Sequence, residues 1–309
     1  MPSRAELNIR AKVVGVVSAN YPNDSKFEQR IIYEEKNAAA ETGALATGTL
    51  TSDATNVTAL DTVTIGAKTY KFVTALTEVK AAQTLTSDAT NVDDGDTVTI
   101  DAVTYTFKTT LSTNPTKPFE VLIGTDAATS LDYLLMAINA TGGTEGTEWS
   151  TGTTAHPSVT ATTNANTTQI VEAKVPGTNG NKISVAETSA HLSWGAAKLA
   201  SGVNPIANEV VIGSAAADTL DNLKTTINGT GQGTTCSTGT VASDEVTATT
   251  NSDTQQVVQA IQYGSGNTIA STEASTHLAW GATTLASGDP KVIAAAALDN
   301  SNFAGGARV

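Results

Sequence analysis

The chain has little of several things on which many enzymes and secreted domains depend. Its 309 residues include one cysteine, Cys236, so no disulfide framework can form within the chain. Aromatic residues make up 5%, which is sparse for a sugar-binding platform, and no apolar run approaches the roughly 20 residues that a membrane helix needs. We therefore expect no disulfide-stapled fold, no membrane span and no role for Cys236.

The familiar catalytic motifs are also absent from the sequence. It contains no Gly-x-Ser-x-Gly elbow, phosphate-binding loop, dinucleotide fingerprint or zinc-ligand pattern. The N-terminus lacks the apolar stretch of a secretory signal, so we expect synthesis in a cytoplasm. We expect a protein that is not an enzyme and that carries no cofactor.

Charged residues are scarce and mostly acidic. They make up 15% of the chain, with a formal net charge of −13. A polyanion such as DNA is repelled by such a surface on average, which argues against nucleic-acid binding. Thr, Ser, Ala, Gly and Asn replace the missing charges, a composition typical of extracellular or virion β-proteins.

The strongest feature that is present is an internal repeat. The string TLTSDATNV occurs at residues 49–57 and again at 84–92, and each copy continues into DTVTI. The second copy runs on through EVLIG at 120–124 to HLSWG at 191–195. The matching continuation of the first copy, EVVIG at 209–213 and HLAWG at 277–281, comes only after that.

This order predicts that one module is inserted into the other. Insertion is tolerated where a surface loop has its ends close together. We predict an N-terminal helical segment at 1–43, a discontinuous module at 44–81 plus 205–289, an inserted module at 82–204, and a C-terminal arm at 290–309. The rival order is three beads, with a stray hairpin, a whole module and a stray half; it would leave the hairpin uncovered.

Each module is predicted to be α+β, with antiparallel strands and one helix packed across a face. Alternating apolar residues predict hairpins at 61–72 and 96–107, and strands at 121–123 and 210–212. Helices follow, the first capped by Thr129 or Ser130, with apolar stripes of Leu131, Leu134, Leu135 and Ile138, and of Leu220, Leu223 and Ile227. Further strands are expected at 159–162, 169–174, 182–185, 246–249, 256–261 and 268–270.

The first 43 residues differ in composition and cluster charges of both signs. Ser3 and Glu6 form a possible capping box for a helix through about Val14, and Asn23 or Asp24 can cap a second helix through about Ala40. This helix–extended loop–helix pattern resembles the HeH/SAP-type fold. In several families that fold binds DNA, but here the charges nearly balance and no basic face is present, so docking onto a protein partner or trimer-like packing of the helices is favoured.

The sequence contains three histidines, His156, His191 and His277, which are candidate metal ligands or catalytic bases. His191 and His277 occupy matching places beside Trp194 and Trp280, with no carboxylate or cysteine nearby at metal-ligand spacing. We therefore interpret both as structural residues, and His156 as a loop residue. The run Asp93–Asp96 lacks the spacing and terminal Glu of a calcium loop, so a β-turn is expected and no metal site is predicted.

The repeated motifs also resemble sequences of a known group of proteins. The run from GDTVTIDAVTYTFKTTL through AKVPGTNGNKISV resembles a module of structural proteins in tailed double-stranded-DNA bacteriophages. That resemblance implies a virion protein without catalytic residues. Such modules occur in head decoration proteins, head fibres and tail components. The favoured hypothesis is a capsid decoration (cement) protein that binds the major capsid protein or other virion proteins, with self-association expected. A tail or fibre adhesin is the alternative, and a secreted bacterial binding module is a third.

Partner-binding residues are expected in the two flanking segments. A flexible arm that orders on binding can bury apolar side chains on a shell, each contributing roughly 1.5–3 kcal/mol before ordering costs. The candidates are Phe27, Ile31, Tyr33, Ile293, Leu298 and Phe303.

Overall fold

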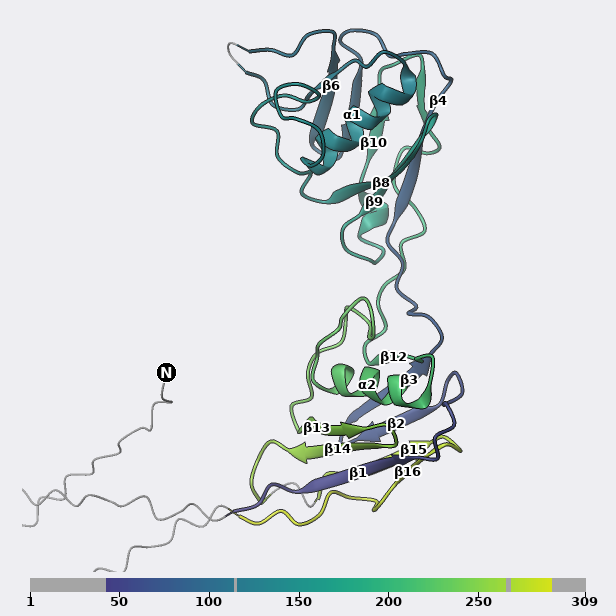
Figure 1. The fold of residues 1–309 in the computed structure, drawn as a ribbon, viewed down its shortest axis with the longest axis vertical. Helices are drawn as coiled ribbons and strands as arrows, with labels where there is room; N and C mark the ends of the chain where they lie inside the picture. Colours follow the sequence, from purple (N-terminus) through teal and green to yellow (C-terminus); the bar gives the residue numbers. More distant parts are fainter. Residues whose placement is uncertain (1–42, 114–115, 265–267, 291–309) are drawn as a thin grey trace, which may run out of the picture.

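The structure, a computed structural model, describes residues 43–113, 116–264 and 268–290. This part is a β-rich α+β fold with four four-stranded sheets and two helices, arranged as two lobes joined by a narrow waist (Figure 1). The predicted N-terminal helices and the residues after Pro290 lie outside the described residues. No helix in the described ranges is long and apolar enough to cross a membrane.

The upper lobe comprises residues 82–204. One sheet has the order β11-β4-β9-β8 and the other β10-β5-β6-β7. The elements are β4 (Ala82–Ser87), β5 (Thr97–Ile100), β6 (Val103–Lys108), β7 (Glu120–Leu122), α1 (Ala127–Asn139), β8 (Val159–Ala165), β9 (Thr168–Ala173), a 3-10 turn (Gly180–Lys182), β10 (Val185–Glu187) and β11 (Leu192–Trp194).

The lower lobe comprises residues 43–81 and 205–290 and has the same two sheets, ordered β13-β14-β1-β16 and β12-β3-β2-β15. Its elements are β1 (Thr47–Ser52), β2 (Thr62–Ile65), β3 (Lys68–Val73), β12 (Glu209–Val211), α2 (Ala216–Ile227), β13 (Val246–Ser252), β14 (Gln255–Ala260), β15 (Ser271–Ala274) and β16 (Leu278–Trp280).

The early hairpin β2–β3 pairs with strands that come more than a hundred residues later. Phe72 in β3 lies opposite Val210 in β12, and Val63 in β2 lies opposite Glu273 in β15. The corresponding pairs in the upper lobe join Phe107 to Val121 and Val98 to Glu187. The hairpin is thus covered on both edges by strands that follow the upper lobe in sequence, and it is not a stray ribbon.

The predicted antiparallel strands make up most of each sheet, but one pair in each lobe is parallel, which the sequence analysis did not predict. β12 runs parallel to β3, and β7 runs parallel to β6, while the other pairs among the named strands are antiparallel. A parallel pair needs a long crossover connection. In the lower lobe the whole upper lobe occupies that connection, and in the upper lobe a loop from residue 109 to residue 119 does so.

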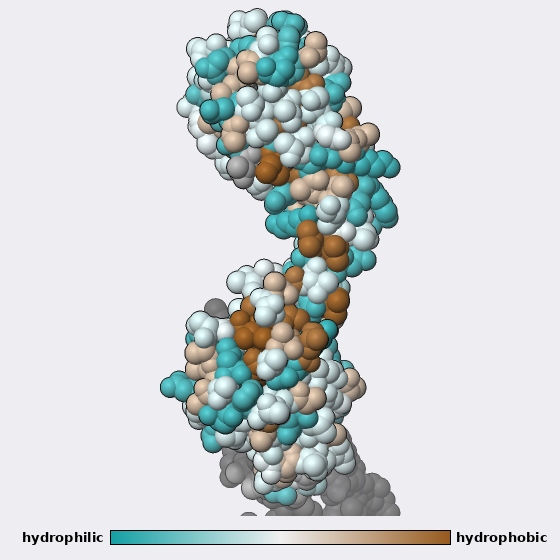
Figure 2. Space-filling model, turned by 90° about the vertical axis from the view of Figure 1, so that its right-hand side faces the viewer, coloured by the Kyte–Doolittle hydropathy of each residue, from teal (hydrophilic) through white to brown (hydrophobic). Residues whose placement is uncertain are grey.

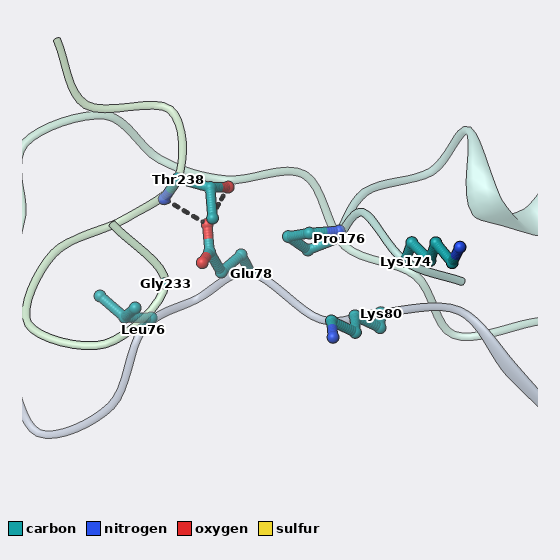
Figure 3. Close-up of a pocket in the computed structure, with 7 residues that line it drawn as sticks. All are labelled: Leu76, Glu78, Lys80, Lys174, Pro176, Gly233 and Thr238. Carbon is teal, nitrogen blue, oxygen red and sulfur yellow. Dashed lines mark hydrogen bonds between the residues drawn. The ribbon is translucent and has the colours of Figure 1, made fainter. Parts of the chain in front are cut away.

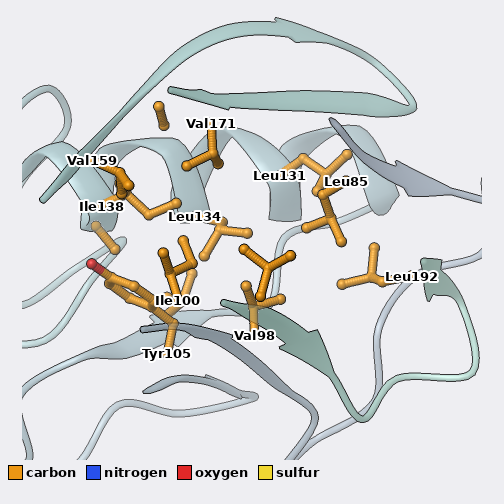
Figure 4. Packing of buried hydrophobic residues seen from close by; sticks show 14 of the residues in the cluster. Leu85, Val98, Ile100, Tyr105, Leu131, Leu134, Ile138, Val159, Val171 and Leu192 are labelled. Carbon is orange, nitrogen blue, oxygen red and sulfur yellow. The ribbon is translucent and has the colours of Figure 1, made fainter. Parts of the chain in front are cut away.

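Each lobe has its own apolar core between its two sheets and its helix. Figure 4 shows the upper core, in which Leu131, Leu134 and Ile138 of α1 face Val98 and Ile100 of β5. Leu220, Leu223 and Ile227 of α2 fill the same role below. The apolar stripes predict this packing, except that Leu135 is only half-buried. The two clusters share no residue, so each lobe can bury its core alone.

The helix of the upper lobe begins one turn away from the predicted cap. Asp126, rather than Thr129 or Ser130, is the N-cap, and its carboxylate accepts hydrogen bonds from Thr129 N and Oγ1, both at 2.8 Å. Gly124 precedes the helix because a Cβ there would lie 2.5 Å from the Cβ of Thr129. Gly213 meets the same obstacle below, which explains the glycine that ends both EVxIG motifs.

Two predicted strands were misplaced. Residues 180–182 form a 3-10 turn, and the strand starts at Val185. In the lower lobe the equivalent strand starts at Ser271 rather than residue 268. Two central strands, Thr47–Ser52 and Ala82–Ser87, contain the repeated string TLTS but were not predicted as strands. Three of the four residues in TLTS are polar, so the string lacks the apolar alternation of a strand.

One edge strand in each lobe, β8 above and β13 below, is partly protected against pairing with another chain. Asn139 at the end of α1 donates Nδ2 to Ala161 O and accepts Ala161 N on the free edge of β8. Asn228 forms the same pair with Ala248 on β13. These side chains occupy backbone groups that would otherwise template edge-to-edge association.

Separate cores predict separate unfolding. Leu134→Ala should destabilise the upper lobe by about 2–5 kcal/mol, because a fully buried leucine is lost, and leave the lower lobe unchanged. Leu223→Ala is the matched variant for the lower lobe. Hydrogen exchange of the full chain, resolved by lobe, measures both. Equal loss of protection in both lobes from either variant would contradict independent folding.

Candidate functional site

The repeated SDATNV string is a structural turn. Ser52 Oγ accepts Ala54 N at 3.1 Å and Asp53 Oδ1 accepts Thr55 N at 2.8 Å, while Ala54 has a left-handed φ of 68°. In the upper lobe the same atoms of Ser87 and Asp88 hold Ala89 and Thr90. The polar side chains of the repeat are therefore used in holding the backbone.

The asparagine of the string ties the turn to the helix. Asn56 donates Nδ2 to Gly213 O at 2.8 Å, and its Oδ1 accepts Thr219 Oγ1 at 2.7 Å. Asn91 makes the same bonds to Gly124 O and Ser130 Oγ. One side chain thus links the end of the first sheet, the strand before the helix and the first turn of the helix.

A histidine–aspartate pair lies in each lobe. His191 Nδ1 is 3.0 Å from Asp88 Oδ2, and His277 Nδ1 is 3.0 Å from Asp53 Oδ2. The local sequence shows no carboxylate at metal-ligand spacing, and the structure adds what the spacing could not indicate: each aspartate comes from the repeat a hundred or more residues away. Within the described residues no group of three or more His, Cys, Asp or Glu side chains gathers to hold a metal ion.

The pair in the upper lobe shifts both of its ionisations. The hydrogen bond from His191 lowers the pKa of Asp88, and the hydrogen bond to Asp88 raises the pKa of His191 above its usual 6.5, with Asp93 and Asp96 adding to that rise. A histidine with a raised pKa stabilises the folded state below pH 6.5, and this stabilisation is lost as pH rises through the folded pKa. Both groups are solvent-exposed, so the effect on stability is small.

Removal of the carboxylate should reverse the shift. Asp88→Asn is expected to bring the pKa of His191 back towards 6.5, because the ring loses its charged hydrogen-bond acceptor. Nuclear magnetic resonance titration of the His191 ring measures this. Asp93→Asn, which removes a charge without a hydrogen bond, is the control and should lower the pKa less. An unchanged His191 titration in Asp88→Asn would contradict the pairing.

The two tryptophans after the histidines face inward. Trp194 and Trp280 are half-buried and pack against the apolar clusters of their lobes. Trp280 Nε1 donates to Thr272 O at 3.2 Å. A flat sugar-binding platform needs an exposed aromatic face, and these side chains do not present one.

Other predicted sites resolve into structure. Asp93–Asp96 form the expected turn, in which Asp96 Oδ2 accepts Asp93 N at 2.9 Å, and Asp94 pairs with Lys108 at 2.7 Å. His156 lies in a loop, as predicted, but it is fully buried, which the sequence did not indicate. Burial raises the pKa of the Cys236 thiol, which disfavours the reactive thiolate.

The waist is formed by residues 77–81 and 202–206, which run side by side. Val79 N donates to Val203 O at 3.1 Å, and Val203 N donates to Val79 O at 3.0 Å. Val79, Val203 and Ile206 are 40–48% exposed, since a connection two strands wide has no interior. Their apolar surface is visible at the narrowing of the molecule (Figure 2).

Two side chains fasten the waist to the lobes. Glu78 Oε2 accepts Thr238 N at 2.8 Å and Thr238 Oγ1 at 2.7 Å in the lower lobe. Asn204 Oδ1 accepts Thr178 N at 2.8 Å in the upper lobe. Figure 3 shows Glu78 beside a hollow of about 390 Å³, which is also lined by the exposed Lys80 and Lys174. Its polar lining is solvent-exposed or already paired, so we interpret the hollow as a gap between lobes.

The base of the lower lobe repeats the geometry of the waist. Asp289 N donates to Ala44 O at 2.8 Å, and Thr47 and Ala286 exchange two hydrogen bonds at 2.8 and 2.9 Å. Ala82 and Ala200 do the same above the waist, at 2.9 and 3.0 Å. The two ends of the described chain therefore leave the lower lobe together, away from the upper lobe (Figure 1).

Loss of the two fastening side chains should loosen the waist. The double variant Glu78→Ala, Asn204→Ala is expected to broaden the range of lobe–lobe distances while both lobes stay folded. Small-angle X-ray scattering measures the distance distribution. Thr113→Ala is the matched control, because Thr113 is the upper-lobe counterpart of Glu78 and lies at the far tip. An unchanged distribution in the double variant would show that other contacts fix the lobes.

The predicted partner-binding residues are not tested by this geometry. Phe27, Ile31, Tyr33, Ile293, Leu298 and Phe303 all lie outside the described residues. Comparison with known proteins found no matching protein family, no matching curated protein and no matching solved structure.

Proposed function

We propose that this chain is a structural protein of a tailed-bacteriophage virion, most specifically a capsid decoration protein. In this proposal residues 1–43 and 290–309 attach to the major capsid protein or another virion protein, and the two lobes project. The observation that supports it is the pairing of Ala44 with Asp289, which places the two points where the flanking segments join the lower lobe side by side at its base.

We also propose that the lobes are two copies of one module, with the second inserted into the first. The matching sheet orders, the matching Asn56 and Asn91 bonds and the matching His–Asp pairs support a common origin. An inserted copy extends the molecule away from its base without moving either end of the chain. That suits a projection held by its ends.

The surface of the lobes fits dense display on a particle. Residues 43–290 contain nine lysines and 23 aspartates and glutamates, while all four arginines lie in the flanking segments. Lobes of like charge do not aggregate readily, and Asn139 and Asn228 cover part of the edge strands β8 and β13, so neighbouring copies can be displayed without adhering to one another. Many copies can then stand close together on a shell, where several weak contacts add through avidity.

A catalytic role is not part of the proposal. The polar side chains that repeat between the lobes hold turns and strands, and the acidic surface does not favour nucleic acid. In this proposal, self-association arises through the flanking segments and the shell. The alternative is a tail or fibre protein with adhesive modules, which would use the upper lobe at a host surface.

Quantitative mass spectrometry of purified virions separates these functions. A decoration protein predicts tens to hundreds of copies per particle and binding to empty heads. A chain cut to residues 43–290 should keep the melting behaviour of both lobes and lose binding to empty heads. A handful of copies per particle, with host adsorption lost on deletion, would instead establish the tail or fibre alternative.

A further inference from the structure

His156 is a buried, titratable residue without a titratable counterpart in the lower lobe; the buried Cys236 of the lower lobe likewise has none above, where Trp149 takes its place. His156 is fully buried in the loop before β8, and its backbone N donates to Ile138 O of α1 at 2.8 Å. Its Nε2 lies 3.1 Å from Ile100 O in β5. Its Nδ1 lies 3.1 Å from Ser158 N and 3.2 Å from Val159 N.

These partners determine the tautomer of His156. A backbone carbonyl can only accept, so Nε2 carries the proton, and backbone N–H groups can only donate, so Nδ1 is bare. The neutral ring thus links β5 to the start of β8. A second proton would place an N–H on Nδ1 directly opposite two N–H donors, and the hydrogen bonds to Ser158 and Val159 would be lost.

The surroundings offer the charged ring little compensation. Burial has the largest effect and lowers the pKa of His156 below its usual 6.5. The hydrogen bond to Ile100 O and the charge of Asp101 in the β5–β6 turn act against this, and Lys174 after β9 adds to it. The ring of Tyr105 in β6 lies 6.5 Å from the imidazole. The groups that face His156 thus include one carboxylate and one ammonium, which largely oppose each other.

Ser243 occupies the same place in the lower lobe and does not titrate near neutral pH. Its backbone N donates to Ile227 O at 2.8 Å, and its Oγ accepts Glu245 N at 3.3 Å and Val246 N at 3.2 Å. The lobes otherwise share their exposed pair, His191–Asp88 above and His277–Asp53 below. The lower lobe is therefore the internal comparison for His156. The upper loop also holds Glu145 and Glu148, which accept Gly152 N and Thr144 N and have no carboxylate counterpart in residues 228–243, so the variant His156→Ser is what isolates the histidine.

We propose that His156 is an acid-sensitive latch, whose protonation releases the loop of residues 140–158 at the tip of the upper lobe while the lower lobe stays closed. The loop is held between Ile138 of α1, Ile100 of β5 and the first residues of β8, and His156 is bonded to all three. The inference does not depend on the proposed virion function.

Hydrogen exchange of the full chain at pH values from 7.5 to 5.5 tests the latch, with rates corrected for the intrinsic effect of pH. Protection of residues 140–160 should fall by up to about tenfold for each pH unit between 6.5 and the folded-state pKa, because the open form takes up a proton that the closed form excludes. Protection of residues 228–247 should not follow this trend. The same pH response in both loops would overturn the proposal.

The variant His156→Ser places the lower-lobe residue in the upper lobe and should abolish the difference in pH response. His191→Gln is the matched control and should preserve it. A response that persists in His156→Ser would overturn the proposal. If that variant does not fold, titration of the His156 ring in the natural chain decides instead: a pKa below 6.5 supports the latch, and one at or above 6.5 rules it out.

Discussion

The architecture depends on one short backbone ladder, in which Val79 and Val203 exchange two hydrogen bonds. This contact brings the two ends of a 123-residue stretch, residues 81–203, close together. A loop with adjacent ends can carry a folded domain without disturbing the sheet to which it belongs. β3 and β12 pair in parallel, so a crossover connection between them is required. In the lower lobe that connection contains the whole upper lobe.

The paired chain ends also limit how the two lobes can move relative to each other. The same geometry recurs at the base, between Ala44 and Asp289, so the chain enters and leaves each lobe at one point. A lobe joined by two strands cannot swivel as freely as one on a single linker, and Glu78 and Asn204 restrain it further. The result is an extended body in which both ends of the described chain lie at one end, the arrangement on which the proposed attachment rests.

Much of this could be predicted from sequence, because the repeat supplies two independent readings of every element. The hairpins, the helices with Leu134 and Leu223, and the late completion of the lower sheets follow from alternation and from the order of the motifs. Other features are properties of three-dimensional contact. Asp88 meets His191 only after folding, and Asp126 caps a helix whose apolar stripe begins several residues later. The parallel pairing of β12 has no local signature at all.

The repeat also shows where to look for what is particular to each lobe. Positions that match, such as Asn56 and Asn91, serve the shared fold. Positions that differ between the lobes are not required by the shared fold. The upper lobe has His156, Thr113 and Trp149 where the lower lobe has Ser243, Glu78 and Cys236. Composition could not predict the roles of His156 and Glu78. These residues stand out only when each is compared with the residue at the equivalent position of the other lobe.

Excision tests the central claim most directly. Residues 80–202 would be replaced by a short Gly–Asn turn that joins Val79 to Val203, with the rest of the chain unchanged. This deletion variant would be examined by calorimetry and hydrogen exchange. If the ladder joins two self-sufficient lobes, the lower lobe folds cooperatively, with the protection that β2, β3 and β12 have in the intact chain. A shortened chain that fails to fold, or that leaves the β2–β3 hairpin unprotected, would contradict the account.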